Sequence, residues 1–260
     1  MVSIIDIVSF ANSALRFNPN RSNIFPIRGM LRWPSLCHIC RCWPSQPLCA
    51  SCIDRFAQPT LRCPVCALTL SQTICRNCIE HPSPLDACVA AVSYAFPWSD
   101  CIARLKFQAD PNMARTLAEL MRHAPWVEPA LDAASLVVPM PLSATRLRER
   151  GFNQAFELAR HLAPHKTDVQ TLLRSNDSAH QVGASREERL GHVKDAFWVA
   201  PERVATVRGQ RVVLVDDVMT TGASLYEAAR ALRAAGTAHI TGLVLARTEA
   251  RETLRAHARQ

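Results

Sequence analysis

The chain has 260 residues, of which 48% are hydrophobic and 20% are charged, and its formal net charge is +8 at pH 7. This length and balance predict a soluble, globular protein with one medium domain and room for a small module. No apolar stretch approaches the length of a membrane span, and the first residues lack the basic segment and cleavage site of a signal peptide, so we expect a cytoplasmic protein. Almost all of the positive charge comes from arginine, which suits contacts with phosphate or nucleic acid but is equally explained by genomic base composition.

Residues 1–35 are weakly patterned, and we expect them to form an extension that either packs poorly or docks as a short helix. Residues 36–80 contain four Cys-x-x-Cys pairs, and the last two pairs repeat the spacing of the first two. In a cytoplasmic chain this spacing indicates metal ligands rather than disulfides. The eight cysteines of the repeat are Cys37, Cys40, Cys49, Cys52, Cys63, Cys66, Cys75 and Cys78.

This repeat predicts a double zinc ribbon, because two Cys-x-x-Cys turns place four thiolates around one tetrahedral Zn²⁺. Sulfur fills every position of such a site, so we expect both zinc sites to be structural. Either consecutive or alternate pairs could share a metal, and the unbroken repeat favours consecutive pairs. Cys42, Cys88 and Cys101 fall outside the repeat, and we expect them to be small apolar residues.

A proline-containing linker at residues 81–84 leads into residues 85–250, where strand-like and helix-like stretches alternate. This alternation predicts an α/β domain in which helices cover both faces of a parallel sheet. The predicted strands cover residues 87–96, 136–138, 169–173, 211–215 and 241–246. The predicted helices cover residues 99–107, 113–123, 153–162 and 223–235.

The most informative stretch is VVLVDDVMTTGAS at residues 212–224. Its aliphatic run predicts a strand buried on both faces, and Asp216 and Asp217 follow where open α/β sheets bind ligands. The next turn offers hydroxyl and backbone N–H donors before a helix N-terminus, which suits a phosphate monoester. The turn residues are Thr220, Thr221, Gly222 and Ser224. The alternative is an ordinary buried strand with an acidic turn.

This stretch resembles the ribose-phosphate signature of the type I phosphoribosyltransferases. The resemblance implies that Asp216 and Asp217 hold the ribose hydroxyls and take part in catalysis, while residues 220–224 surround the 5′-phosphate. It also implies 5-phosphoribosyl 1-diphosphate as the ligand, with Mg²⁺ as its accompanying cation.

A basic segment follows the predicted strand at residues 136–138 and reads PMPLSATRLRERGFNQA. Arg146, Arg148 and Arg150 concentrate positive charge beside Gly151, and a pyrophosphate site needs such charge next to a flexible turn. A solvated basic turn explains the three arginines equally well when they are considered alone.

Residues 139–159 resemble the VPxPL…R…RGFNQ…LA segment of the ComF family of competence proteins. The order of the parts along residues 37–247 also resembles that family: cysteine pairs come first, then the arginine segment, then the acidic motif. The resemblance implies a zinc-ribbon module on a phosphoribosyltransferase-like domain, linked to the uptake of single-stranded DNA during natural transformation. It further implies a hood or mobile loop, with Arg174, Gln181, Arg186 and Arg189 as its candidate residues. His192 and Ala184 depart from the family pattern, which usually has Asn and Leu there, and this leaves acceptor recognition open.

Three functions remain open at this point. The first is an enzyme that displaces pyrophosphate from the diphosphate sugar, with the arginine segment stabilising the leaving charge and no acceptor indicated. The second is a single-stranded nucleic-acid-binding protein with a catalytically silent pocket. The third is a scaffold that recruits competence or DNA-processing proteins through its zinc ribbons. Candidate stacking platforms for the second function are Trp33, Trp43, Trp98 and Phe152.

Overall fold

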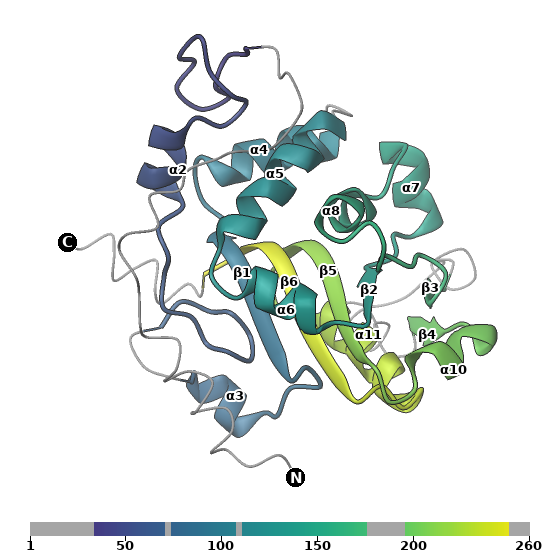
Figure 1. The fold of residues 1–260 in the computed structure, drawn as a ribbon. Helices are drawn as coiled ribbons and strands as arrows, with labels where there is room; N and C mark the ends of the chain where they lie inside the picture. The colour runs from purple at the N-terminus through teal and green to yellow at the C-terminus, as the bar shows by residue number, and fades with distance from the viewer. Residues whose placement is uncertain (1–33, 71–73, 108–110, 176–195, 250–260) are drawn as a thin grey trace, which may run out of the picture.

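The computed structural model describes residues 34–70, 74–107, 111–175 and 196–249 (Figure 1). The extension expected at residues 1–35 lies almost wholly outside this range. Also outside it lie Trp33 and the hood-loop residues Gln181, Ala184, Arg186, Arg189 and His192.

A four-stranded parallel sheet forms the centre of the fold, with the strand order β1-β6-β5-β2 (Figure 1). Its strands are β1 (Ala87–Ser93), β2 (Leu136–Pro139), β5 (Arg211–Met219) and β6 (His239–Arg247). Each neighbouring pair runs parallel. The α/β class and the parallel sheet predicted from the alternating pattern are thereby confirmed.

Helices cover both faces of the sheet, because alternate residues of β5 enter two different hydrophobic cores. On one face, Val213 and Val215 pack into a core that includes residues of α4 (Trp98–Phe107), α5 (Pro111–His123), α6 (Val127–Ala133) and α8 (Gln154–Leu162). On the other face, Val212 and Leu214 pack into a core whose helical residues come mainly from α11 (Ala223–Ala234).

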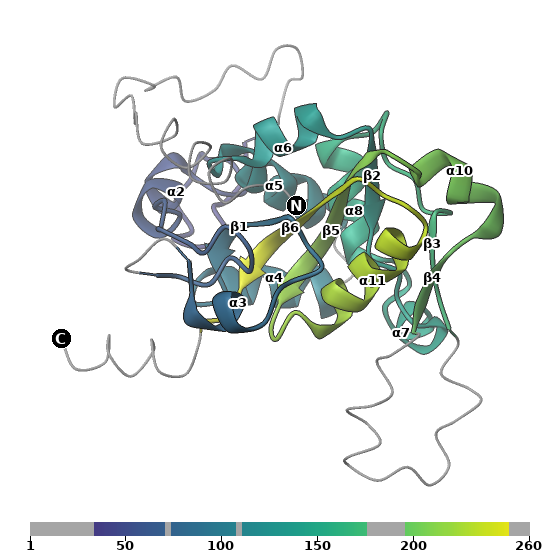
Figure 2. The ribbon, with the colours of Figure 1, turned by 90° about the horizontal axis from the view of Figure 1, so that it is seen from below.

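The cysteine-rich segment lies at the β1 edge of the sheet (Figures 1 and 2). It contains two short helices, α2 (Ala50–Phe56) and α3 (Arg76–Glu80), each of which begins directly after a cysteine of the repeat. Phe56 packs against the α4–α5 core, whereas Cys63 and Cys66 belong to the α11 core. The segment therefore shares both cores of the sheet.

Two predictions about strands were wrong. The predicted strand at residues 169–173 is β3 (Leu172–Arg174), which pairs antiparallel with β4 (Phe197–Val199) in a small separate sheet. The motif strand does not end at residue 215, because β5 continues to Met219 while β6 runs beside it as far as Arg247. The acidic pair consequently lies inside an extended strand and not in the turn after it.

Several short elements were not predicted at all. The basic segment forms a helix, α7 (Ala144–Arg150), where we expected a flexible turn. Other elements that were not predicted include α2, α3, β4, α6 (Val127–Ala133), α10 (Val204–Val207) and a 3₁₀ helix (Pro201–Arg203). The small β3–β4 sheet and α10 lie at the β2 end of the molecule, away from the cysteine-rich segment (Figures 1 and 2).

Candidate functional site

The acidic pair occupies the last part of β5, where the neighbouring side chains give the two carboxylates different environments. Asp217 is buried, and its Oδ2 lies 3.0 Å from Nζ of Lys106 on α4. The backbone N–H of Asp217 donates to Oδ1 of Asp216 over 2.8 Å. Burial, followed by the neighbouring charge of Asp217, raises the pKa of Asp216 from 3.8 to about 7. One member of the pair is thus a paired carboxylate, and the pKa of the other is raised toward neutral pH.

A tight turn joins β5 to α11, and we call residues 220–222 the glycine loop. Gly222 adopts φ +86° as the N-cap of α11, and a Cβ there would lie 2.5 Å from Cε of Met219 and 2.9 Å from Cζ of Tyr226. Only glycine satisfies both the backbone conformation and the space. Thr220, Thr221 and Ser224 are exposed around this turn. The first turn of α11 therefore presents hydroxyl and N–H donors to solvent, which suits an anion.

The arginine segment is an ordered helix with defined caps at both ends. Ser143 Oγ accepts a hydrogen bond from the N–H of Arg146 over 3.4 Å, and Gly151 ends α7 with φ +77°. The side chain of Asn153 then caps α8 by accepting from two of its first N–H groups. The Arg150 guanidinium donates to Oε1 of Gln154 over 2.9 Å. The contact between Arg150 and Gln154 joins the basic helix to the first residue of α8.

A cavity of about 310 Å³ lies between the end of α4 and α7, lined by Lys106, Phe107, Arg146, Glu149 and Arg150. Arg146 and Arg150 are four residues apart, so they share one side of α7. Arg148, the third predicted arginine, is exposed and does not line the cavity. Because Lys106 also pairs with Asp217, it connects this cationic cavity to the acidic end of β5.

Sequence reasoning missed Lys106, which lay within a correctly predicted helix. Nothing in the periodicity of α4 marks this residue. The one available signal is composition, because lysine is rare in a chain whose basic residues are nearly all arginine. Of the predicted hood residues, only Arg174 is described, and its guanidinium lies 5.3 Å from the ring centroid of Phe197.

The cysteines form two clusters, each of which could hold a metal ion. In the second cluster, the thiols of Cys63, Cys66, Cys75 and Cys78 lie within 4.8 Å of one another, as the repeat predicted. The Sγ atoms of Cys66 and Cys75 are 3.5 Å apart. The Cys66 thiol donates to Cys63 and lowers the pKa of Cys63 to about 4, which favours a thiolate there. Consecutive Cys-x-x-Cys pairs thus meet in this cluster.

The first cluster contains one cysteine more than the repeat supplies. Thiols of Cys37, Cys40, Cys42 and Cys49 lie within 4.8 Å of one another, and Sγ of Cys52 is 3.9 Å from Sγ of Cys37. The expectation that Cys42 is a small apolar residue was wrong, because its side chain is exposed beside these thiols.

The other two cysteines outside the repeat differ from Cys42. Both Cys88 and Cys101 are buried in the hydrophobic cores, as expected for small apolar residues. Burial raises the pKa of the Cys88 thiol to about 12 and that of the Cys101 thiol to about 11, so both stay protonated at neutral pH. These two thiols therefore serve packing in the described structure.

A parallel sheet with an acidic pair and a glycine loop at one strand end defines a phosphoribosyltransferase-type domain. In agreement, the family profile described as "Phosphoribosyl transferase domain" matches residues 147–259. The chain is 31% identical to the DNA utilization protein YhgH of Escherichia coli K12 over 235 residues, which covers 84% of this chain and 100% of that protein. With this relative and the competence proteins below, the chain belongs to the ComF family.

Competence proteins are similar over shorter stretches. Competence protein F of Haemophilus influenzae is 34% identical over 172 residues, covering 62% of this chain and 73% of that protein. Competence protein ComFC of Bacillus subtilis is 33% identical over 140 residues, covering 54% of this chain and 55% of that protein.

Two solved structures are similar in part. They are described as an allosteric regulatory enzyme of purine biosynthesis and as glutamine phosphoribosylpyrophosphate amidotransferase from B. subtilis. Sequence identities are 19% and 20%, both TM-scores are 0.33, and each match covers 52% of this chain. This chain spans only 25% and 26% of those longer chains.

Two further expectations concern membranes and stacking platforms. Among the residues that the structure describes, no helix is both long and apolar enough to cross a membrane.

Trp98 is 2% exposed and donates its indole N–H to the carbonyl of Phe56, so it is a core residue and cannot stack on a base. Phe152 is half-buried against the α4–α5 core, whereas Trp43 is 61% exposed.

Proposed function

We propose that the protein binds 5-phosphoribosyl 1-diphosphate together with Mg²⁺ at the end of β5, and that it acts in handling DNA taken up by the cell. One observation carries the first part of this proposal. The acidic pair, the glycine loop at the N-terminus of α11 and a cavity lined by Lys106, Arg146 and Arg150 lie around the same end of the sheet. The names of the curated relatives support the second part.

Each part of the site suits a different part of the proposed ligand. The carboxylates of Asp216 and Asp217 accept hydrogen bonds from the ribose hydroxyls. The exposed hydroxyls of Thr220, Thr221 and Ser224, with the N–H groups of the first turn of α11, bind the 5′-phosphate. The guanidinium groups on α7 face the diphosphate and balance its charge.

The oxygen ligands of this site fit Mg²⁺, which prefers carboxylates and phosphates. Asp216 and the diphosphate oxygens would hold the cation, which would neutralise charge on a leaving pyrophosphate. The raised pKa of Asp216 makes this contact sensitive to pH near neutrality. The two cysteine clusters fit Zn²⁺, because each offers four thiols within reach of one tetrahedral ion.

Calorimetric titration with the diphosphate sugar tests this proposal through the variants Asp216→Asn and Asp217→Asn. Each change removes a charged acceptor, so affinity should fall by about tenfold or more. Asp132→Asn is the matched control, because Asp132 is exposed on α6, at a distance in the fold from the motif. Equal affinity of all three variants and the wild type would place the ligand elsewhere.

Single-strand binding is the second candidate, and exposed aromatic rings near arginines favour it. Phe107 is 75% exposed at the cavity, and the Arg150 guanidinium lies 5.8 Å from its ring centroid. A base can stack on such a ring while the arginines contact phosphate. We expect Phe107→Ala to weaken oligonucleotide binding about tenfold, while Arg148→Ala lowers the salt dependence of that binding. Oligonucleotide binding that depends neither on salt concentration nor on Phe107→Ala or Arg148→Ala would rule this function out.

A further inference from the structure

Arg247, the last residue of β6, is a buried cation that contacts two regions far apart in the sequence. It is 5% exposed, and its Nε donates to the carbonyl of Cys66 over 2.9 Å. Its Nη1 donates to the carbonyl of Met219 over 3.0 Å and also to the carbonyl of Thr220. One guanidinium thus connects a cysteine of the second cluster with the start of the glycine loop.

The Cys66 carbonyl is held in place by the fold of its own turn. The N–H of Ala67 donates to the carbonyl of Cys63 over 2.8 Å, and Ala67 adopts φ +57°. The N–H of Cys88 in β1 donates to the carbonyl of Pro64 over 2.7 Å. The position of the carbonyl that Arg247 contacts is therefore set by the Cys-x-x-Cys turn.

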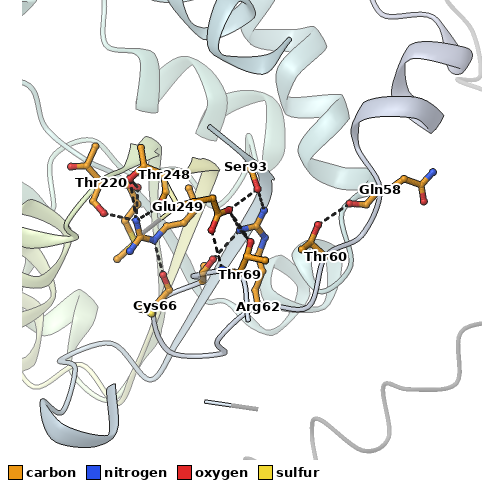
Figure 3. A network of polar contacts seen from close by, with 12 residues as sticks. Gln58, Thr60, Arg62, Cys66, Thr69, Ser93, Thr220, Thr248 and Glu249 are labelled. Carbon is orange, nitrogen blue, oxygen red and sulfur yellow. Dashed lines mark hydrogen bonds and ion pairs between the residues drawn. The ribbon is translucent and has the colours of Figure 1, made fainter. Parts of the chain in front are cut away.

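A second group of contacts holds the same turn against the ends of β1 and β6 (Figure 3). Glu249 Oε1 accepts from Ser93 over 2.7 Å and from Thr69 over 2.8 Å, and it pairs with Arg62 at 3.3 Å. Arg62 also donates to Ser93 over 2.9 Å. These contacts keep the cysteine turn and the strand that carries Arg247 in one arrangement.

Packing connects the same two regions on the apolar side. Sγ of Cys88 lies 3.7 Å from Sδ of Met219, whose Cε fills the space beside Gly222. Tyr226, in the first turn of α11, packs with the second cluster in one hydrophobic core. Burial, followed by the nearby Cys66 and Cys78, raises the pKa of Tyr226.

The first cluster has different neighbours. Its helix α2 packs through Ile53 and Phe56 against the α4–α5 core on the opposite face of the sheet. His38 contacts Arg104 of α4 at 2.8 Å, and the carbonyl of Phe56 accepts from Trp98. Within the described residues, the segment around the first cluster therefore contacts α4 and the α4–α5 core, and these contacts do not involve the glycine loop.

From these contacts we propose that Arg247 is a positioning residue through which metal binding at the second cysteine cluster sets the glycine loop. The proposal rests on the proposed function only in taking this loop as the phosphate-binding segment. A metal ion held by four thiolates gives the second cluster a net negative charge beside the buried guanidinium. When the metal is lost, the two Cys-x-x-Cys turns are no longer joined by a common ion, and Arg247 loses a fixed Cys66 carbonyl as its partner. Its two contacts on Met219 and Thr220 then loosen.

The test compares loss of metal from each cluster in the full chain. Cys75→Ser/Cys78→Ser empties the second cluster without changing Cys66, and Cys49→Ser/Cys52→Ser removes the equivalent pair of the first. Metal content is measured by mass spectrometry, and amide hydrogen exchange is followed over residues 216–226 without any ligand. We expect each double variant to lose one metal ion, and only the variant of the second cluster to exchange faster in this segment. Equal exchange in the two double variants would overturn the proposal.

Variants of Arg247 separate positioning from general stability. Arg247→Met should keep both metal ions, speed exchange over residues 216–226 and weaken binding of Mg²⁺–diphosphate sugar by about fivefold or more. Arg247→Lys keeps the charge and should recover part of this loss. Arg233→Met is the matched control, because Arg233 also donates to two backbone carbonyls but at the far end of α11. A similar effect of Arg233→Met and Arg247→Met on the segment would contradict the proposal.

The wild-type protein gives an independent test that needs no variant. Coupling is reciprocal, so the diphosphate sugar with Mg²⁺ should slow chelator-induced release of one metal ion of the two by about fivefold or more. Equal release of both ions with and without the sugar contradicts the coupling once calorimetry shows that the sugar binds. If the sugar does not bind, the proposed function fails, and hydrogen exchange without ligand still decides whether Arg247 couples the two regions.

Discussion

Nζ of Lys106 lies 3.0 Å from Oδ2 of Asp217, and this contact joins α4 to the acidic end of β5. Both side chains are largely buried, with exposed fractions of 19% and 11%. Lys106 also lines the cavity beside Arg146 and Arg150. A lysine from outside every recognisable motif is thus part of the candidate site.

Lys106→Met should weaken binding of the diphosphate sugar about tenfold. It should also lower the free energy of unfolding by roughly 1–3 kcal/mol, because the buried Asp217 loses its charged partner. Calorimetry and urea denaturation measure the two effects. Lys166→Met is the control, since Lys166 donates to the carbonyl of Leu131 at a distance from the cavity. That variant should lose some stability but keep its affinity. Unchanged affinity of Lys106→Met would remove this residue from the site.

Asp216 should make the stability of the ligand-free protein depend on pH. Its folded pKa of about 7 lies above the ordinary value of 3.8, so the folded state binds this proton more tightly than the unfolded state. The contribution of Asp216 to stability is therefore fully present below about pH 4 and is lost as pH rises to about 7. Urea denaturation should show that the free energy of unfolding falls less between pH 5 and pH 8 for Asp216→Asn than for the wild type. Identical losses in both proteins would contradict this assignment.

Gly222→Ala tests the geometry of the glycine loop. Its Cβ would lie 2.5 Å from Cε of Met219 on a backbone with φ +86°, so we expect a loss of about 1–3 kcal/mol in the free energy of unfolding and loss of sugar binding. Gly209→Ala separates backbone strain from lack of space, because Gly209 has φ +70° and nothing within 4 Å of an added Cβ. Thermal denaturation should show the larger effect for Gly222→Ala, and an equal effect would mean that the space beside Met219 does not matter.

The additional thiol of the first cluster predicts a tolerant metal site. Cys52→Ser leaves Cys37, Cys40, Cys42 and Cys49, whose thiols lie within 4.8 Å of one another, so this variant should still hold two zinc ions per chain. Cys42→Ser should also hold two zinc ions, because Cys52 then supplies the fourth thiol of the first cluster. Cys63→Ser should lose one ion, because the second cluster has four thiols. Metal analysis of purified protein checks all three, and loss of zinc from Cys52→Ser alone would show that Cys42 is no ligand.

The sequence predicted the central strands well because β5 and β6 are buried on both faces and carry continuous aliphatic runs. It failed to predict α7, whose residues are mostly charged and exposed and give no apolar periodicity. The extension of β5 to Met219 depends on pairing with the distant β6, which local residue patterns do not report. Long-range contacts thus account for the misplaced strand end.

The candidate site was predictable where its residues are contiguous and not where the fold brings them together. The acidic pair and the glycine loop form one segment with recognisable chemistry. Lys106 and Arg247 instead come from the ends of α4 and β6, and their roles depend on contacts with Asp217 and Cys66. Cys42 was set aside because it breaks the spacing of the repeat, although its turn brings it to the first cluster.

Binding of the diphosphate sugar is the central claim, and calorimetry of the wild-type chain tests it most directly. The sugar is titrated with and without Mg²⁺, beside ribose 5-phosphate alone and pyrophosphate alone. Because the proposal assigns separate parts of the site to the two ends of the ligand, we expect one sugar per chain and a Mg²⁺-dependent affinity about tenfold or more above that of either fragment. No binding of the sugar, or an affinity no higher than that of ribose 5-phosphate, would contradict the account.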